Sequence, residues 1–84
     1  MQTIYGTETE PAVARAGKLA LQEGKTIALG VHESAAGFYV GTRYFDATLG
    51  FEVPFTREST EYWPTEKQAQ TANATGAWTQ KRSL

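Results

Sequence analysis

The sequence predicts an α+β domain, in which a three-stranded antiparallel meander is flanked by an N-terminal and a C-terminal helix. Three alternating apolar segments, separated by glycine-containing turns, lie within residues 25–56. A helix-start signal precedes this region and a capping box follows it. A chain of 84 residues is long enough for one core only, so we expect a single domain over residues 1–84.

The N-terminal helix is expected over residues 10–23. Thr9 can cap its first turn, Pro11 falls where a missing N–H costs nothing, and Gly24 can end it in the left-handed conformation. Its predicted inward face consists mostly of small residues, which let a helix approach a sheet closely: Val13, Ala16, Gly17, Ala20 and Leu21.

The predicted strands cover residues 25–33, 38–45 and 51–56. The second is apolar on both faces, which is typical of a central strand or of a strand with an exposed contact surface. Pro54 cannot donate to a ladder and therefore predicts that the third strand lies at an edge. Residues 3–5 are a candidate fourth strand.

The C-terminal helix is expected over residues 66–75. Thr65 and Gln68 have the spacing of a capping box, and Gly76 is a typical end residue. Only a few alanines offer it an apolar stripe, so neighbouring aromatic residues must help to dock it. Residues 77–84 form a tail that can add one short strand.

The amino-acid composition argues against several classes of function. Eight Lys and Arg against nine Asp and Glu, mixed along the chain, give a net charge of −1, which argues against a polyanion binder and against a DNA mimic. The absence of cysteine excludes disulfides, thiolate zinc sites and cysteine nucleophiles. No leader-like or membrane-spanning stretch is recognisable, so a cytoplasmic protein without a membrane partner is expected.

The sequence offers no convincing catalytic or metal site. His32, Glu33 and Ser34 are adjacent on a predicted strand, where neighbours point to opposite faces and cannot form a relay. A single histidine far from Asp46 provides no metal-ligand spacing. Glu58 and Glu61 are expected to be ordinary solvated glutamates, with Arg57 in a surface ion pair. We therefore expect no enzyme, no catalytic residue and no cofactor.

Two segments are candidates for binding a partner. Aromatic and arginine side chains, the types enriched at interface hot spots, share one face of the second strand or lie in the connection that follows the third. These candidates are Tyr39, Arg43 and Phe45 on the strand, and Arg57, Glu58, Tyr62 and Trp63 in the connection. If the C-terminal helix covers the strand face, its three residues are core and only the connection remains.

The sequence supports nucleic-acid binding less well than protein binding. Residues 37–40 match in part the aromatic strand of an RNA-recognition sheet, but Ala36 stands where a basic residue would be informative, and the overall charge is unsuitable. Nucleic acid is therefore not the expected partner, and a weak single-stranded nucleic-acid binder stays a third hypothesis.

A pattern over residues 37–82 resembles small orphan proteins of bacterial phages and plasmids. It consists of Gly37-Phe38-Tyr39-Val40-Gly41-Thr42, Phe55-Thr56-Arg57-Glu58-Ser59, Tyr62-Trp63, Thr65-Glu66, Ala69, Gly76-Ala77-Trp78 and Arg82. Within that class, the best-characterised members of this size are stoichiometric inhibitors of host defence, including anti-CRISPR proteins. The resemblance implies an inhibitor that blocks a host protein by steric occlusion.

The resulting expectation is a non-enzymatic protein-binding module, encoded by a mobile element and directed against a host protein or complex. The alternative is a self-assembling accessory protein that forms a homodimer, because a small core and an exposed edge strand favour self-association.

Overall fold

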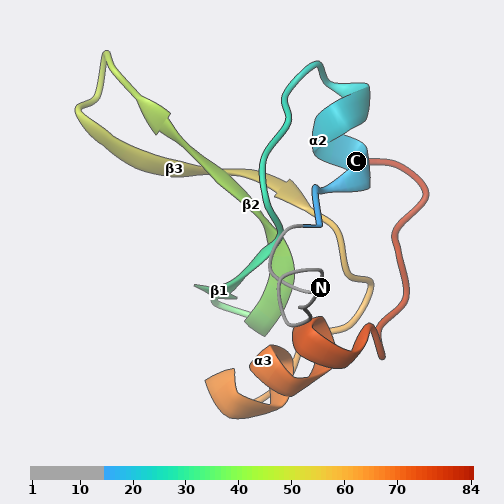
Figure 1. The fold of residues 1–84 in the computed structure, drawn as a ribbon. Coiled ribbons are helices and arrows are strands. Elements are labelled where there is room, and N and C mark those ends of the chain that lie inside the picture. Colours follow the sequence, from blue (N-terminus) through green and yellow to red (C-terminus); the bar gives the residue numbers. More distant parts are fainter. Residues whose placement is uncertain (1–14) are drawn as a thin grey trace, which may run out of the picture.

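A computed structural model describes residues 15–84 of the chain. The elements follow in the order α2 (Lys18–Gln22), β1 (Gly30–Ser34), β2 (Gly37–Asp46), β3 (Phe51–Arg57) and α3 (Glu66–Thr75) (Figure 1). The strands form one antiparallel sheet in the order β1-β2-β3. The predicted α+β class and the antiparallel meander are therefore confirmed.

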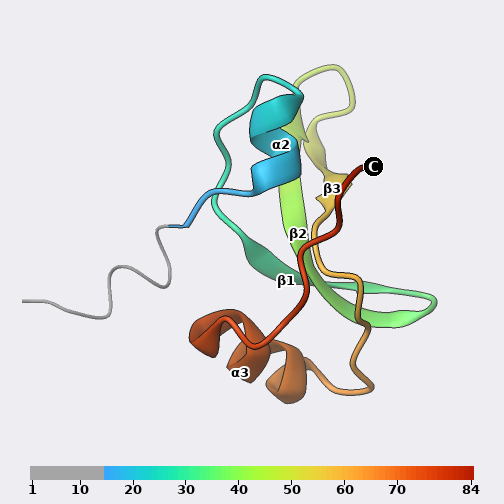
Figure 2. The same cartoon turned by 90° about the vertical axis from the view of Figure 1, so that its right-hand side faces the viewer.

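Strand β2 is central, as predicted, but its two neighbours cover different parts of it. β1 pairs only with its first half, from Gly37 to Gly41. β3 pairs with its second half, from Gly41 to Asp46, with an irregularity between Thr42 and Arg43. Beyond Gly41 the sheet is therefore a two-stranded hairpin, which points away from α3 (Figures 1 and 2) and diverges from α2 (Figure 1). Pro54 lies in the edge strand β3, also as predicted.

The predicted strand 25–33 is wrong in its first half, because residues 25–29 do not join the sheet. Ala28 instead forms an isolated antiparallel bridge with Ala16. The backbone N–H of Gly17 donates to Ile27 at 2.9 Å, and that of Leu29 donates to Arg15 at 2.9 Å. The apolar alternation of this segment does reflect an extended chain, but the chain pairs with a different neighbour.

The predicted helix 10–23 is shorter within the described part of the chain. Gly17 is extended, and α2 begins at Lys18. Leu19 and Ala20 are buried, whereas Leu21, predicted to face inward, is 50% exposed. The bridge to Ala28 keeps the backbone extended up to Gly17 and so delays the first helical turn. Gly24 has φ 89°, as expected for the residue that follows the helix end. Residues 10–14 of this prediction and the candidate strand 3–5 lie outside the described residues.

Helix α3 has the predicted bounds and caps. The hydroxyl of Thr65 accepts from the N–H of Gln68 at 3.2 Å, and Gly76 adopts the left-handed conformation with φ 77°. Ala69 and Ala72 are buried, and the helix lies under the end of the sheet that contains β1 (Figure 1). The tail then returns to the sheet region, where Gln80 forms a bridge with Ser59.

The core formed by residues 15–84 is small and has a polar centre. The buried hydrophobic side chains are Leu19, Ala20, Tyr39, Val40, Ala69 and Ala72. Four polar residues are buried with them: Thr42, Thr56, Glu58 and Ser59. Because so little apolar surface is buried, the hydrogen bonds of these polar groups matter unusually strongly for the stability of the fold.

Candidate protein-binding surface

Alternation along β2 places Tyr39, Arg43 and Phe45 on one face of the sheet, as predicted. The opposite face carries Thr42, which lies against the start of α2: a Cβ added to Gly17 would meet the Thr42 methyl group at 2.6 Å. Helix α2 therefore covers the Thr42 face. We call the face that carries Tyr39, Arg43 and Phe45 the aromatic face.

Arg57 and Tyr62, from the predicted connection, join Tyr39 on the aromatic face. The Arg57 guanidinium lies 5.1 Å from the centre of the Tyr39 ring and 5.6 Å from that of Tyr62. It also donates from Nη1 to the Tyr62 hydroxyl at 2.6 Å. We call this arrangement the arginine clamp. The attraction between the guanidinium charge and the two tyrosine rings holds the Arg57 side chain in place although the residue is exposed.

Tyr39 is at the base of the clamp, where its ring is 2% exposed. Arg57, Tyr62 and His32 cover it, and the His32 ring centre lies 5.8 Å away. Tyr39 therefore offers almost no surface for a partner to contact. Among residues 15–84, Arg57 does not form the expected ion pair. The ion pair found in this part of the chain joins Arg43 Nε to Glu52 Oε1 at 3.9 Å.

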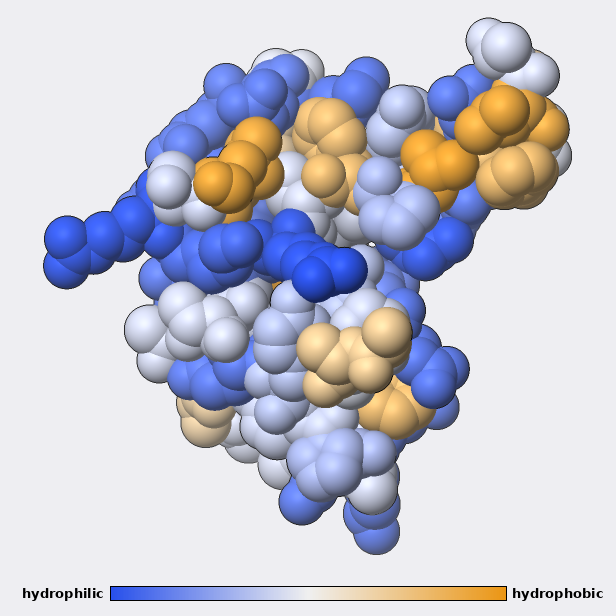
Figure 3. Space-filling model, turned by 180° about the vertical axis from the view of Figure 1, so that it is seen from behind, coloured by the Kyte–Doolittle hydropathy of each residue, from blue (hydrophilic) through white to orange (hydrophobic). Residues whose placement is uncertain are grey.

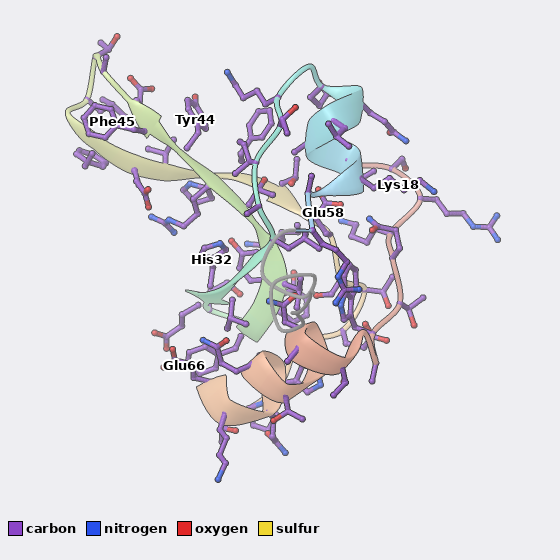
Figure 4. The ribbon with its side chains drawn as sticks, in the orientation of Figure 1. Lys18, His32, Tyr44, Phe45, Glu58 and Glu66 are labelled. Carbon is purple, nitrogen blue, oxygen red and sulfur yellow. The ribbon has the colours of Figure 1, made fainter. Side chains whose placement is uncertain are left out.

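The far end of the hairpin exposes large apolar side chains. Phe45 is 61% exposed, Leu49 55% and Phe51 57%. We call these three residues the hairpin tip. Figure 3 shows hydrophobic side chains gathered on this projecting part of the molecule, and Figure 4 shows Phe45 near its end. Apolar surface concentrated on a projection usually marks an interaction site.

The turn that carries Leu49 is closed by hydrogen bonds to Asp46. Its Oδ1 accepts from the N–H groups of Thr48 at 2.9 Å and of Leu49 at 3.1 Å. Its carbonyl accepts from Gly50 at 2.7 Å, and Gly50 has φ 83°. Leu49 is consequently presented on a backbone that is already ordered, which lowers the entropic cost of binding.

Sequence reasoning found Phe45 but missed Leu49 and Phe51. Neither Leu49, in the turn, nor Phe51, at the start of the third strand, is among the predicted candidates. Both are exposed because α2 and α3 lie nearer the other end of the sheet. The hairpin's own sequence carries no signal of where these helices lie.

The prediction that Glu58 is a solvated glutamate is wrong, because its side chain is 0% exposed. Its Oε1 accepts from the N–H of Leu19 at 2.9 Å and from Gln80 Nε2 at 2.7 Å. Its Oε2 accepts from the N–H of Ala20 at 3.0 Å and from the Thr56 hydroxyl at 2.6 Å. Figure 4 shows it at the base of α2. Glu58 therefore caps the helix and belongs to the interior.

The carboxyl group of Glu58 is charged despite its burial. Burial by itself raises its pKa, but the hydrogen bonds from Leu19, Thr56, Gln80 and Ala20 outweigh this effect and hold the pKa below its usual value. Burial also raises the pKa of Glu61, but hydrogen bonds from Thr79 outweigh this effect, so the pKa of Glu61 is lowered as well. Neither carboxyl group is poised for acid–base work at neutral pH.

Trp63 lies apart from the arginine clamp. Two backbone hydrogen bonds, of 2.9 and 2.8 Å, join it to Phe38. Its half-buried side chain lines an open groove of about 480 Å³ beside α3, together with Thr65, Gln68, Thr71 and Thr75. The predicted connection therefore divides into Arg57 and Tyr62 on the aromatic face, Glu58 in the interior, and Trp63 at this groove.

No catalytic constellation appears around the histidine. The Ser34 hydroxyl donates to the Gly37 carbonyl and accepts from the Ala36 N–H within the β1–β2 turn. Burial lowers the pKa of His32, and the positive charge of Arg43 lowers it further. Over residues 15–84, no group of three His, Asp or Glu side chains could hold a metal ion. In the same part of the chain, neither helix has the length and apolarity needed to cross a membrane.

Comparison of the chain with protein-family models, with curated proteins and with solved structures gives no match.

Proposed function

We propose that this protein is a non-enzymatic protein-binding module whose principal contact is the hairpin tip. The observation that supports this proposal is a pre-ordered turn that presents Leu49 between two exposed phenylalanines, on a projection that neither α2 nor α3 covers. Large apolar side chains held in this way are typical anchors for a pocket on another protein.

The chemistry around the tip favours a protein over a membrane or a nucleic acid. Asp46 and Glu52 are the charged residues nearest to the tip in sequence, whereas a membrane-surface anchor carries Lys and Arg there. Within residues 37–40, which match an RNA-recognition strand in part, Tyr39 is buried, and the exposed rings of Phe45 and Phe51 adjoin the acidic Asp46 and Glu52 and not basic residues. An apolar pocket on a protein suits the tip best.

The partner expected from the mobile-element resemblance is a host protein or complex. A rigid projection that occupies a functional pocket would inhibit it by steric occlusion. This route needs no catalytic group and no cofactor.

Binding from a bacterial lysate tests the tip through one substitution. We expect Leu49→Asp to abolish capture of any specific partner, because a buried carboxylate without a counterion strongly opposes docking. Leu84→Asp is the matched control: it makes the same change at an exposed position of the tail. Captured proteins are identified by mass spectrometry and retested in purified form. A purified partner that binds wild type and Leu49→Asp equally well would contradict the proposal.

Self-association is the second candidate function. Within the described residues, the hairpin pairs its strands only with each other, so its outer edges and tip are open to a second copy. Sedimentation velocity over a range of concentrations tests this candidate. A dimer that disappears in Leu49→Asp supports it, and a strict monomer at high micromolar concentration excludes it.

A further inference from the structure

Arg57 has more hydrogen-bonding capacity than its neighbours use. A guanidinium carries five N–H donors in a planar fork. Within residues 15–84, one hydrogen bond leaves the Arg57 guanidinium, to Tyr62, and no carboxylate lies within ion-pair distance of it. The centres of the two tyrosine rings lie 5.1 and 5.6 Å from the guanidinium carbon, and the residue is exposed, so N–H donors are left for a further acceptor.

The surroundings of Arg57 favour a negative ligand. On the aromatic face, Arg43 is the other arginine. It donates from Nη2 to the Glu52 carbonyl at 3.1 Å, and its Nε lies 3.9 Å from the Glu52 carboxylate. His32 completes this part of the face without adding a negative charge. An incoming anion therefore meets two arginines and one glutamate.

We propose that the arginine clamp recognises a carboxylate of the partner protein, an Asp or Glu that lies near the apolar pocket for Leu49. The inference rests on the proposed function, because it specifies a second feature of the same partner. Arg57 is opposite Gly41, and the hairpin ends at the Asp46–Phe51 pair. Five residues along a strand correspond to about 17 Å. Because Leu49 lies in the turn beyond the Asp46–Phe51 pair, we expect the acidic group and the apolar pocket to be farther apart than this distance.

The arginine clamp suits a carboxylate because the Arg57 side chain is already ordered before any ligand binds. A planar guanidinium pairs with a carboxylate through two parallel hydrogen bonds, and side-chain entropy is the main cost of fixing an arginine. Here the rings of Tyr39 and Tyr62 already restrict the side chain. A phosphate group has similar donor requirements, so the experiment must compare both anions.

Nuclear magnetic resonance of the arginine Nε–Hε groups provides a direct test that needs no partner. The probes are a capped tri-glutamate peptide and, separately, inorganic phosphate. We expect the Arg57 signal to shift in a saturable manner with the peptide. Arg57→Gln should abolish the saturable site, and Arg57→Lys, which keeps the charge, should weaken binding about tenfold because it loses the bidentate fork. Tyr62→Phe should weaken it by a smaller factor.

Arg82→Gln is the matched control, because it removes the same charge from an exposed position in the tail. Backbone amide spectra of each variant establish that the fold is intact. The proposal is overturned if the Arg57 and Arg82 signals respond alike and without saturation, or if phosphate saturates the site and the peptide does not. If Leu49→Asp abolishes partner capture while Arg57→Gln leaves it unchanged, the hairpin tip stands and the acidic contact is wrong. If Arg57→Gln abolishes capture while Leu49→Asp leaves it unchanged, the acidic contact is supported and the hairpin tip is not the principal contact.

Discussion

At the scale of single residues, Glu58 receives more hydrogen bonds than any side chain on the aromatic face. Its carboxylate accepts from two backbone N–H groups, one hydroxyl and one amide. Glu58→Gln replaces one acceptor oxygen by an NH₂ group, which then faces donors. We expect a loss of about 2–3 kcal/mol in the free energy of unfolding, measured with urea. Glu33→Gln, at an exposed position of β1, is the control and should change stability by less than about 0.5 kcal/mol.

The pH dependence of stability follows from the same residue. A carboxyl group with a lowered pKa in the folded state binds fewer protons there than in the unfolded chain, so its contribution is present above the ordinary value of 4.5 and is lost as pH falls below it. His32 acts in the same direction at higher pH, because its folded pKa lies below 6.5. Stability should therefore decline first below pH 6.5 and more steeply below 4.5.

Urea unfolding at a series of pH values measures this decline. In Glu58→Gln the steeper phase below pH 4.5 should become shallower, and Glu61 should account for what is left of it. An unchanged acid profile in that variant would show that the Glu58 carboxylate does not control acid unfolding.

At the scale of elements, the ends of α3 are held by local chemistry. The Thr65 hydroxyl accepts from the Gln68 N–H, and Gly76 supplies the left-handed residue at the other end. We expect Thr65→Ala to lower the free energy of unfolding by about 1 kcal/mol, because one N–H of the first turn loses its partner. Thr65→Ser keeps the acceptor oxygen and should retain most of the stability. Equal losses in both variants would argue against the capping role.

Predictions succeeded where the determining contacts are local. The bounds of α3 follow from Thr65, Gln68 and Gly76, which all lie within its own sequence. The same holds for Pro54, since a missing N–H marks an edge without reference to the rest of the chain. Arg43 and Phe45 share one face because strand alternation fixes the direction of side chains. Arg57 joins this face through the irregularity in the β2–β3 register, which the sequence does not show.

Predictions failed where the partner is distant in sequence. Alternation around Ile27 indicates an extended chain but cannot reveal that the chain pairs with Ala16 and not with β2. The burial of Glu58 depends on N–H groups of α2 that are 38 and 39 residues away. A glutamate among polar neighbours therefore looked solvated. The exposure of Phe51 likewise depends on where α2 and α3 lie, which the hairpin's own sequence does not show.

At the scale of the whole molecule, Glu58 joins parts of the chain that otherwise share little apolar contact. It links α2, β3 and the tail, and the mostly small buried side chains leave few alternatives for holding them together. This arrangement separates stability from binding. The polar centre determines whether the protein folds, whereas the hairpin tip lies outside it, so substitutions at the tip should leave the fold intact.

The tail provides the test of this arrangement. Residues 79–81 pair with the segment after β3: Thr60 donates to Thr79 at 2.9 Å, Lys81 donates to Glu58 at 2.7 Å, and the N–H of Thr79 donates to Glu61 at 2.9 Å. Deletion of residues 79–84 removes these bonds and leaves the Glu58 carboxylate without Gln80. We expect a loss of about 3–5 kcal/mol in the free energy of unfolding, a large part of the stability of so small a domain. Deletion of residues 83–84 alone should be nearly neutral, because both are exposed. If the two deletions unfolded at the same urea concentration, the tail would be an appendage and the core around Leu19 and Val40 would suffice.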